Sequence, residues 1–201
     1  MTRDQGMREY YRRRAREYDD WWKGTGLYAE LERPGWEEEV AGLIAALEAL
    51  EPAATLDVAC GTGFLTQHLR GDVVGLDQSA AMAAIARERL RDGEAVCAEA
   101  IPLPFADGSF ERIFTSHYYG HLLEEERVEF LAQARRVAGE LVVVDAALRP
   151  NRPAEHWQER ALRDGSKHRV FKRFFGAESL RAEVGARRVV HDGAWFVVVA
   201  G

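Results

Sequence analysis

The stretch LDVACGTGFLTQHL, residues 56–69, decides the fold, because an apolar run ends there at a turn of small residues. A carboxylate, Asp57, lies inside the apolar run, and the turn holds two glycines, Gly61 and Gly63. Glycine adopts backbone angles that other residues avoid, and it lets a ligand approach the main chain closely. The stretch therefore predicts a strand, a tight turn with room for a ligand, and then an amphipathic helix over residues 63–70.

Strand and helix patterns alternate along the middle of the chain. Apolar runs predict strands and amphipathic runs predict helices, the strands over residues 55–59, 72–77, 95–99, 110–115 and 140–147 and the helices over 79–91 and 124–138. Ser79 precedes the first of these helices and is expected to cap it. Repeated β-α-β units imply an α/β fold of the Rossmann-like, doubly wound kind, with a mostly parallel sheet between two layers of helices.

The N-terminal region departs from this alternation. Residues 1–50 read as a helical cap, in which Tyr11, Ala15, Tyr18 and Trp22 fall on one helical face. These aromatic side chains could close over a binding site as a lid, or they could belong to a helix that packs on the sheet.

The C-terminal region also departs from it. Residues 176–201 read as a short helix ending at Gly185, followed by two strands that a tight turn at Gly193 joins. This hairpin would lie at the edge of the sheet and contribute an antiparallel last strand, so that seven strands are expected in all.

Composition and charge exclude several classes of protein. The chain is 47% hydrophobic and 30% charged, which is typical of a globular protein, and its net charge of −6 argues against bulk binding to nucleic acid or anionic membranes. No stretch has the length of a membrane span, and the N-terminus does not read as a signal peptide, so a cytoplasmic location is expected. Cys60 and Cys97 lie in apolar runs and are expected to be buried free thiols.

The turn after the first strand suits a cationic ligand better than a dinucleotide. Ligands of open parallel sheets bind beyond the carboxyl ends of the strands. A dinucleotide favours G-x-G-x-x-G, whereas residues 61–66 read GTGFLT, and Asp57 would repel a pyrophosphate. S-adenosylmethionine carries an ammonium and a sulfonium group and no phosphate. Asp77 ends the second strand, where it could accept both ribose hydroxyls, and Glu99 with Ala100 could meet an adenine edge.

Three motifs, DVACGTG, GLDQSAAM and LPFADGSFERIF, resemble those of the class I S-adenosylmethionine-dependent methyltransferases, in the small-molecule group that is similar to ubiquinone and menaquinone biosynthesis enzymes. The resemblance implies S-adenosyl-L-methionine as the cofactor and in-line transfer of its methyl group to a small-molecule acceptor. It implies cofactor-binding roles for Tyr11, Tyr18, Asp57, Ala59, Gly61, Gly63, Asp77, Gln78, Glu99, Ala100 and Ser116.

The chain departs from the family's pattern in places. Ala59 stands where the family usually has glycine, so an ordinary, strand-like φ is expected there, and Glu99 and Glu111 stand where aspartate is usual.

The resemblance also suggests a division of one methyltransferase domain over residues 1–201. Its parts are a helical N-terminal cap (1–50), a cofactor-binding core (55–147), a substrate-side insertion (148–175) and a C-terminal helix with edge hairpin (176–201).

The acceptor is expected beyond the fourth strand, at TSHYYGHLL, residues 115–123. His117 and His121 are candidate general bases, since histidine titrates near neutral pH, although both could have a purely structural role. Tyr118 and Tyr119 could line the substrate pocket or pack in the core.

The insertion concentrates cations in an acidic protein: Lys167, His168, Arg169, Lys172 and Arg173. Lys172 and Arg173 are the candidates that could clamp an anionic group of the acceptor. The alternative is a solvated face with ordinary ion pairs.

Two other functions remain open at this point. An NAD(P)-binding oxidoreductase could use a similar sheet, and a non-catalytic module could bind S-adenosylmethionine without turnover. No metal site is expected, because His117 and His121 lack a surrounding cluster of acids or thiols. The protein is expected to be a monomer or a homodimer.

Overall fold

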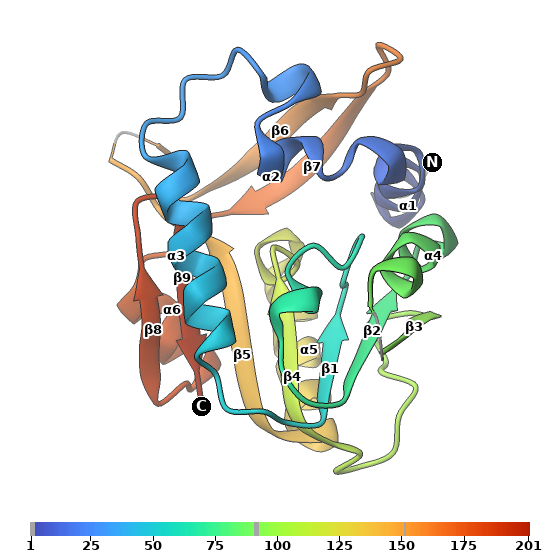
Figure 1. Cartoon of the computed structure of the whole chain (residues 1–201), viewed down its shortest axis with the longest axis vertical. Helices are drawn as coiled ribbons and strands as arrows, with labels where there is room; N and C mark the ends of the chain where they lie inside the picture. Colours follow the sequence, from blue (N-terminus) through green and yellow to red (C-terminus); the bar gives the residue numbers. More distant parts are fainter. Residues whose placement is uncertain (1–2, 91–92, 151) are drawn as a thin grey trace.

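A computed structural model describes residues 3–90, 93–150 and 152–201, with side chains from residue 6 onward. Its centre is a seven-stranded sheet of order β3-β2-β1-β4-β5-β9-β8 (Figure 1). The strands are β1 (Thr55–Val58), β2 (Val73–Asp77), β3 (Glu94–Cys97), β4 (Phe110–Ser116), β5 (Ala138–Ala146), β8 (Arg188–Asp192) and β9 (Phe196–Ala200). The first five are parallel, and β9 is antiparallel to both of its neighbours. The predicted α/β fold and its reversed last strand are confirmed.

Helices cover both faces of this sheet, as a doubly wound fold requires. Figure 1 shows α3 in front of the sheet and α5 and α6 behind it. The helices of the core are α3 (Trp36–Glu48), α4 (Ala80–Arg89), α5 (Glu124–Val137) and α6 (Ala177–Val184). Consecutive residues of β4 point to opposite faces of the sheet. Ile113 belongs to the apolar cluster that includes Phe130 of α5, and Phe114 belongs to the cluster that includes Leu43 of α3.

Three details in and near the opening motif test the sequence predictions. The side chain of Ser79 caps α4 by accepting a hydrogen bond from the Met82 amide, as predicted. The helix expected over residues 63–70 is wrong: only a 3-10 turn, η3 (Thr66–His68), forms there. Ala59 is not strand-like either, because its φ is 61°. The chain turns over the end of β1 so that the Cys60 amide can donate to the Leu76 carbonyl of β2, 2.9 Å away.

The two cysteines differ in their surroundings. Cys60 is buried beneath the turn, as expected, whereas Cys97 is exposed at the end of edge strand β3. The expectation of a buried Cys97 is wrong because no further strand covers β3 in the sheet order.

The N-terminal cap is broken into short pieces rather than one helical face. It consists of α1 (Arg3–Arg14), η1 (Ala15–Glu17), α2 (Asp20–Lys23) and η2 (Gly26–Tyr28). Trp22 leaves the predicted face and packs in the core, where its ring stacks on Phe64 at 5.0 Å and on Phe196 at 5.6 Å. Burial of this large ring outweighs the local helical preference.

Residues 155–173 form a second, two-stranded sheet that the sequence patterns did not reveal. The strands β6 (Glu155–Ala161) and β7 (Lys167–Arg173) pair antiparallel and lie above the seven-stranded sheet, next to the N-terminal cap (Figure 1). Polar residues occupy both faces of β6, so its apolar periodicity is weak. The hairpin and the cap together cover the carboxyl ends of the parallel strands (Figure 1).

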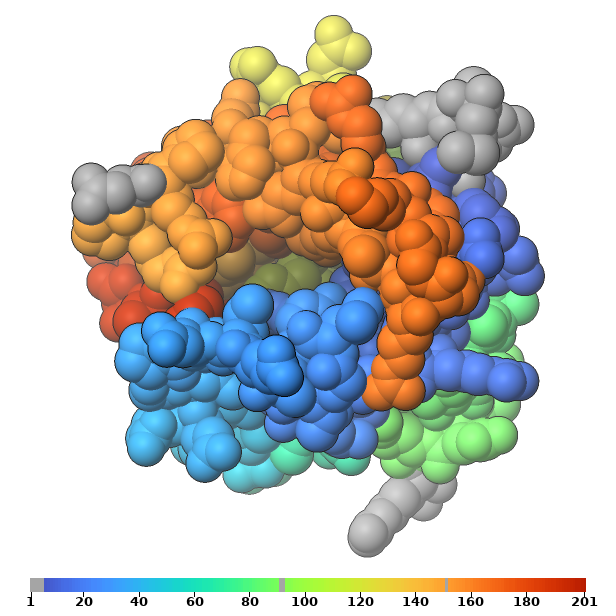
Figure 2. Space-filling view, turned by 90° about the horizontal axis from the view of Figure 1, so that it is seen from above, coloured from blue at the N-terminus to red at the C-terminus, as the bar shows by residue number. Residues whose placement is uncertain are grey.

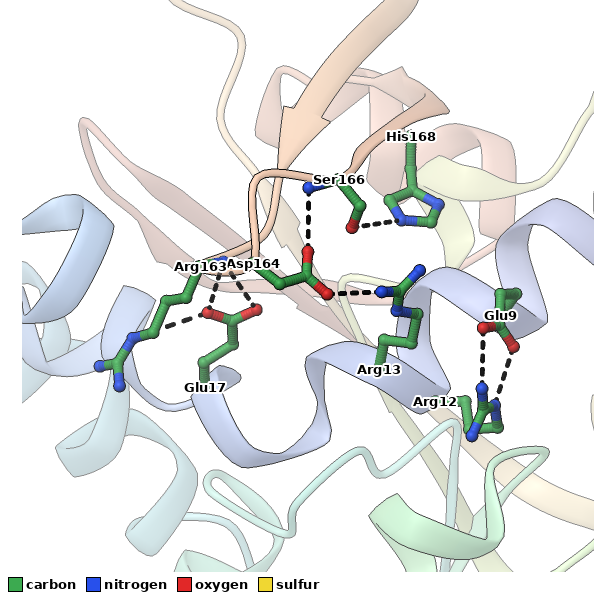
Figure 3. Close-up of polar contacts among 8 residues, drawn as sticks. All are labelled: Glu9, Arg12, Arg13, Glu17, Arg163, Asp164, Ser166 and His168. Carbon is green, nitrogen blue, oxygen red and sulfur yellow. Dashed lines mark hydrogen bonds and ion pairs between the residues drawn. The ribbon is translucent and has the colours of Figure 1, made fainter.

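Ion pairs join the cap to the turn of this hairpin (Figure 3). The guanidinium of Arg13 lies 2.5 Å from Asp164, and the amide of Arg163 donates to the Glu17 carboxylate at 3.1 Å. The Asp164 carboxylate also accepts from the Ser166 amide at 2.9 Å, which holds the turn in shape. Each of these exposed pairs contributes little alone, but together they fix where the cap meets the hairpin.

A glycine between the opening motif and β2 offers a test of the fold. Gly71 has a φ of +101°, and a Cβ there would lie 2.4 Å from the carbonyl oxygen of Ala53. We expect Gly71→Ala to lower the free energy of unfolding by roughly 2 to 4 kcal/mol, through backbone strain and overpacking. Urea denaturation would measure the change. Gly108→Ala is the matched control, since Gly108 has a φ of +64° and a Cβ there would meet no atom within 4 Å, and it should cost only about 1 kcal/mol. Equal losses for the two variants would contradict the contact with Ala53.

Candidate functional site

A cavity of about 300 Å³ lies at the carboxyl ends of β1, β2 and β4, beneath the N-terminal cap. Most of the predicted site residues line it: Tyr11, Tyr18, Ala59, Gly61, Asp77, Gln78, Glu99, Ala100, Ser116, His117, Tyr118 and His121. Five predicted residues are not part of its wall: Asp57, Gly63, Tyr119, Lys172 and Arg173. The sheet thus brings together side chains from five separate stretches of sequence.

The wall also contains residues that the sequence patterns did not single out: Met7, Arg8, Leu76, Met82, Ile101, Leu122, Glu126 and Glu129. Glu126 and Glu129 stand three positions apart near the start of α5, so they share a helix face. An acid-rich first helical turn directly after the expected acceptor region was the signal that could have identified them.

Asp77 ends β2 and holds the turn of the opening motif. One carboxylate oxygen accepts from the Gly61 amide at 3.0 Å, and the other accepts from the Ser79 amide at 2.8 Å. The residue is 8% exposed, and burial raises the pKa of its carboxyl group to about 6 despite these two bonds. Each oxygen retains a further lone pair with which it can accept a hydrogen bond from a ligand.

Tyr18 lies directly over the turn. A Cβ added to Gly61 would come within 3.2 Å of its ring, so the position, with a φ of +57°, accommodates only glycine without strain. The guanidinium carbon of Arg14, the last residue of α1, lies 4.9 Å from the centre of the same ring. The turn, Tyr18 and Asp77 therefore form one narrow part of the cavity wall.

Glu99 lies at the rim and already has a partner. Its carboxylate pairs with both terminal nitrogens of Arg8 from α1, one of them at 2.9 Å, and both side chains are about half exposed. Because this pair is solvated, it can open at little energetic cost when a ligand competes for the carboxylate.

Asp57 lies below the cavity rather than in its wall. It is 1% exposed, and one oxygen accepts from the Thr66 hydroxyl at 2.6 Å. The other oxygen has no hydrogen-bond partner among the described residues. Burial raises the pKa of this carboxyl group to about 8, and the nearby Asp77 adds to the rise, while the bond from Thr66 opposes it.

The protonation of Asp57 gives a testable dependence of stability on pH. The folded protein holds this proton up to a pH of about 8, whereas an unfolded chain releases it near 3.8. Between these values the folded state binds more protons, so this group lowers the free energy of unfolding as the pH rises. We expect Asp57→Asn to lose stability less steeply than the wild type between these two pH values, by urea denaturation. Asp72→Asn, at an exposed position, should follow the wild type. Parallel curves for Asp57→Asn and the wild type would contradict the buried, protonated carboxyl group.

His121 is fully engaged by its neighbours. Its Nδ1 lies 2.5 Å from the carbonyl oxygen of Phe171 and must donate to it, and its Nε2 therefore accepts from the Tyr11 hydroxyl at 3.1 Å. Burial lowers the pKa of this ring well below its ordinary value, with Lys172 and Arg160 adding to the effect. His121 is thus a neutral bridge between the cap and the β6–β7 hairpin.

His117 follows β4 in a strained conformation, with a φ of 55°. Its ring lies among Trp21, Trp22 and Phe196, and its Nδ1 is 3.8 Å from the Asp145 carboxylate. Its Nε2 is buried and has no hydrogen-bond partner in the part of the chain that the structure describes. Burial lowers the pKa of the ring to about 3, and Lys172, Arg160 and Arg14 add to the effect against Asp145.

The remaining substrate candidates have structural partners. Lys172 is buried and pairs with Asp145, and Arg173 donates to Glu183 at 2.9 Å. Tyr119 is fully buried and donates to the same Glu183 at 3.0 Å. Both cations considered from the sequence as an anion clamp thus have a carboxylate partner in the structure. No group of three or more His, Cys, Asp or Glu residues within the described ranges is placed to hold a metal ion.

Comparison with known proteins adds independent information. A family model described as a methyltransferase domain matches residues 56–140. A demethylmenaquinone methyltransferase of Thermotoga maritima is 37% identical over 124 residues, which are 58% of this chain and 52% of that protein. An uncharacterized methyltransferase of Alkaliphilus oremlandii is 27% identical over 154 residues, which are 74% of this chain and 68% of that protein.

Among solved structures, a DhpI–SAM–HEP complex is similar along the whole chain. It has a TM-score of 0.76 and 25% sequence identity, and the match covers 100% of this chain and 98% of that one. By contrast, the chain spans only about half the length of the Thermotoga relative.

Proposed function

Because the chain belongs to the class I S-adenosylmethionine-dependent methyltransferases, we propose that it transfers a methyl group from this cofactor to a small-molecule acceptor by in-line displacement. The observation that carries the proposal is the cavity beyond β1, β2 and β4, with a glycine turn at one side and the Asp77 carboxylate in its wall. The matched residues 56–140 contribute the larger part of that wall.

The residues present fit this cofactor. Asp77 would accept hydrogen bonds from the ribose hydroxyls, and Glu99, released from Arg8, would meet the adenine edge together with Ala100. Gly61 and Ala59 would border the methionine end, where the unpartnered oxygen of Asp57 lies beneath the turn. When bound, S-adenosylmethionine supplies an electrophilic methyl group.

Gln78, Ser116 and Tyr18 would complete the wall around the cofactor, and Tyr11 would close it from the cap through its bond to His121. Gly63 would act indirectly, since a Cβ there would meet the backbone of Ala86 in α4 at 3.3 Å. The absence of a side chain at Gly63 would keep α4 close to the turn, and the wall residues would keep water out of the cavity.

His117 is the better of the two candidate bases. Both nitrogens of His121 are occupied, whereas Nε2 of His117 is unpartnered, and Asp145 lies on the Nδ1 side of its ring. His117 would accept the proton of the acceptor's nucleophile, while Asp145 would favour the tautomer that leaves Nε2 free. Tyr118, which lines the same wall, would help position the acceptor.

The acceptor in this proposal is a small molecule with an anionic group. The volume of the cavity is at the lower end of the usual range for small-molecule sites. Three cations, Lys172, Arg160 and Arg14, contribute to the lowered pKa of His117 at one end of it. The DhpI structure, which is similar over the whole chain, was solved with SAM and a second compound, HEP, which supports a two-compound site on this fold.

The two alternatives are less well supported. A pyrophosphate of NAD(P) would face the carboxylate group of Asp77 beside the turn, which has no cationic partner among the described residues. A non-catalytic module would bind the cofactor without turnover, and only an assay separates it from the enzyme.

Two measurements test the proposed function. Calorimetry should show binding of S-adenosylhomocysteine and no comparable binding of NADH. Incubation with methyl-labelled S-adenosylmethionine and extract of the host cells should then yield a labelled small molecule. Binding without any labelled product would favour the non-catalytic module, and tight NADH binding would favour the oxidoreductase.

The cellular setting stays a prediction. No helix in the described part of the chain has both the length and the apolar character needed to cross a bilayer. The cytoplasmic location, the division into parts and the monomeric or homodimeric state were expected from the sequence and remain to be tested.

A further inference from the structure

Arg14 is a buried cation to which the described residues offer no counter-ion. It is 6% exposed, and its guanidinium donates to the hydroxyl groups of Tyr10 at 2.9 Å and Tyr28 at 3.3 Å. Its carbon Cζ also lies 4.9 Å from the ring centre of Tyr18. It makes no ion pair with any residue that the structure describes. A buried charge that only neutral groups surround is costly unless an anion joins it.

Arg160 is a second cation of this kind. It is half-buried on the inner face of β6, opposite His168. Among the described residues its guanidinium donates only to the Gln158 side-chain oxygen, at 3.0 and 3.3 Å. It too lacks a carboxylate partner within the described ranges. By contrast, Lys167, Lys172 and Arg173 on the facing strand each have one.

Neither guanidinium group is part of the cavity wall, but the two belong to elements that pack against each other, Arg14 to α1 and Arg160 to the β6–β7 hairpin. Arg14 donates to the Tyr10 hydroxyl, and the centre of the Tyr10 ring lies 5.3 Å from that of His168, the residue opposite Arg160 in the hairpin. Burial raises the pKa of Tyr11 to about 12, and Arg160 and Arg14 both oppose this rise. Arg160 and Arg14 also contribute to the lowered pKa of His117 in the cavity wall. Arg160 comes from the hairpin and Arg14 from the cap, and Figure 2 shows a hollow between these two parts of the molecule, orange and blue, open to solvent.

Unpartnered nitrogens mark the same region. Besides Nε2 of His117, Nδ1 of His156 is buried without a hydrogen-bond partner among the described residues. His156 shares the inner face of β6 with Arg160, and its Nε2 lies 3.2 Å from the Gln158 amide nitrogen, which donates to it. Nδ1 of His156 is then an unused donor. The unused donor of His156 and the two uncompensated cations together favour a ligand with several acceptor oxygens.

We propose that Arg14 and Arg160 form the specificity site for the methyl acceptor, binding a compact oxyanion group of it, either a carboxylate or a phosphate-type group. The proposal rests on the proposed function, since it concerns the second substrate of that reaction. Anchored there, the acceptor would extend its nucleophile toward His117 and the cofactor. Arg169, which lies on the outer face of β7 and is exposed, has no part in it.

Such an anion would also prepare the base. The positive charges of Arg160 and Arg14 disfavour a proton on His117, and a bound oxyanion would offset both of them. The acceptor would thereby raise the proton affinity of the group that must take its proton. Binding of the acceptor would therefore make His117 a stronger base.

Inorganic phosphate and acetate serve as probes of the two oxyanion types, titrated by calorimetry into the complex of the full chain with S-adenosylhomocysteine. We expect at least one of them to bind the wild type. Arg160→Gln should weaken that binding by roughly tenfold or more, the loss expected for a charge-assisted hydrogen bond. Arg169→Gln, which removes the same charge from the outer face of the hairpin, should leave it unchanged, and Arg160→Lys should lie between the two.

Two outcomes would overturn the proposal: neither probe binds the wild type, or Arg160→Gln and Arg169→Gln bind the probes equally. S-adenosylhomocysteine binding, measured on the same samples, reports separately on the proposed function and on folding. If Arg160→Gln loses it, the comparison of Arg160→Lys with Arg169→Gln decides in its place, and equal probe affinities for those two would contradict the proposal.

Discussion

Asp77→Ala is expected to weaken binding of S-adenosylhomocysteine by roughly 100-fold or more. Asp77 is the wall carboxylate at the end of β2, and two charge-assisted hydrogen bonds to ribose hydroxyls would be lost together. The variant also removes the acceptor for the Gly61 and Ser79 amides, so the turn that borders the methionine end loses its support. Calorimetry measures the affinity directly.

The structure supplies controls for this prediction. Asp72→Ala removes an exposed carboxylate just before β2 and should leave the affinity unchanged. Asp77→Asn keeps one oxygen and the size of the side chain, so its affinity should lie between those of the wild type and Asp77→Ala. An affinity of Asp77→Ala within about threefold of the wild type would remove Asp77 from the cofactor site, because that is less than one hydrogen bond.

His117→Asn is expected to slow methyl transfer by roughly 100-fold or more, the usual contribution of a general base. Its effect on S-adenosylhomocysteine affinity should be small, since the proposed role of the ring lies on the acceptor side. The measurement is the single-turnover rate of label transfer to the acceptor found in the extract assay. A loss in rate with retained affinity separates a base from a residue that only shapes the cavity.

His121→Asn provides the comparison, because it breaks the bridge between Tyr11 and Phe171. We expect it to weaken closure of the cap, with a loss in cofactor affinity as well as in rate. His191→Asn, on edge strand β8, should change neither. If His117→Asn transfers the label at the wild-type rate, the proposed base is wrong.

Much of the cofactor half of the site could be predicted because it depends on local order along the chain. A parallel sheet brings the residue at the end of each strand to the same edge, so the ends of the strands predicted over 72–77 and 95–99 sufficed to bring Asp77 and Glu99 to one cavity. Asp57 was predicted at the same rim, yet it lies inside β1 and under the turn. Its position in the strand, two residues before the turn, could have indicated this.

The acceptor half could not be predicted in the same way. Lys172 and Arg173 were chosen because cations cluster in that stretch, but each has an acid from a distant part of the chain as its partner, Asp145 and Glu183. Arg14 was hidden in a run of three arginines, and only the contacts of the fold show it to be buried. Pairing of charges over long sequence distances leaves no local pattern.

The sequence by itself determined the order of the seven strands of the central sheet and of helices α4, α5 and α6, the glycine turn and the carboxylate at the end of β2. Periodicity and turn chemistry suffice for these because they act between near neighbours. Only the tertiary structure decided that residues 155–173 pair as a hairpin above the sheet, that Ala59 takes a left-handed conformation, and which cations keep a partner. Those outcomes depend on burial and on contacts between distant segments, and these contribute to the free energy only when the chain has folded.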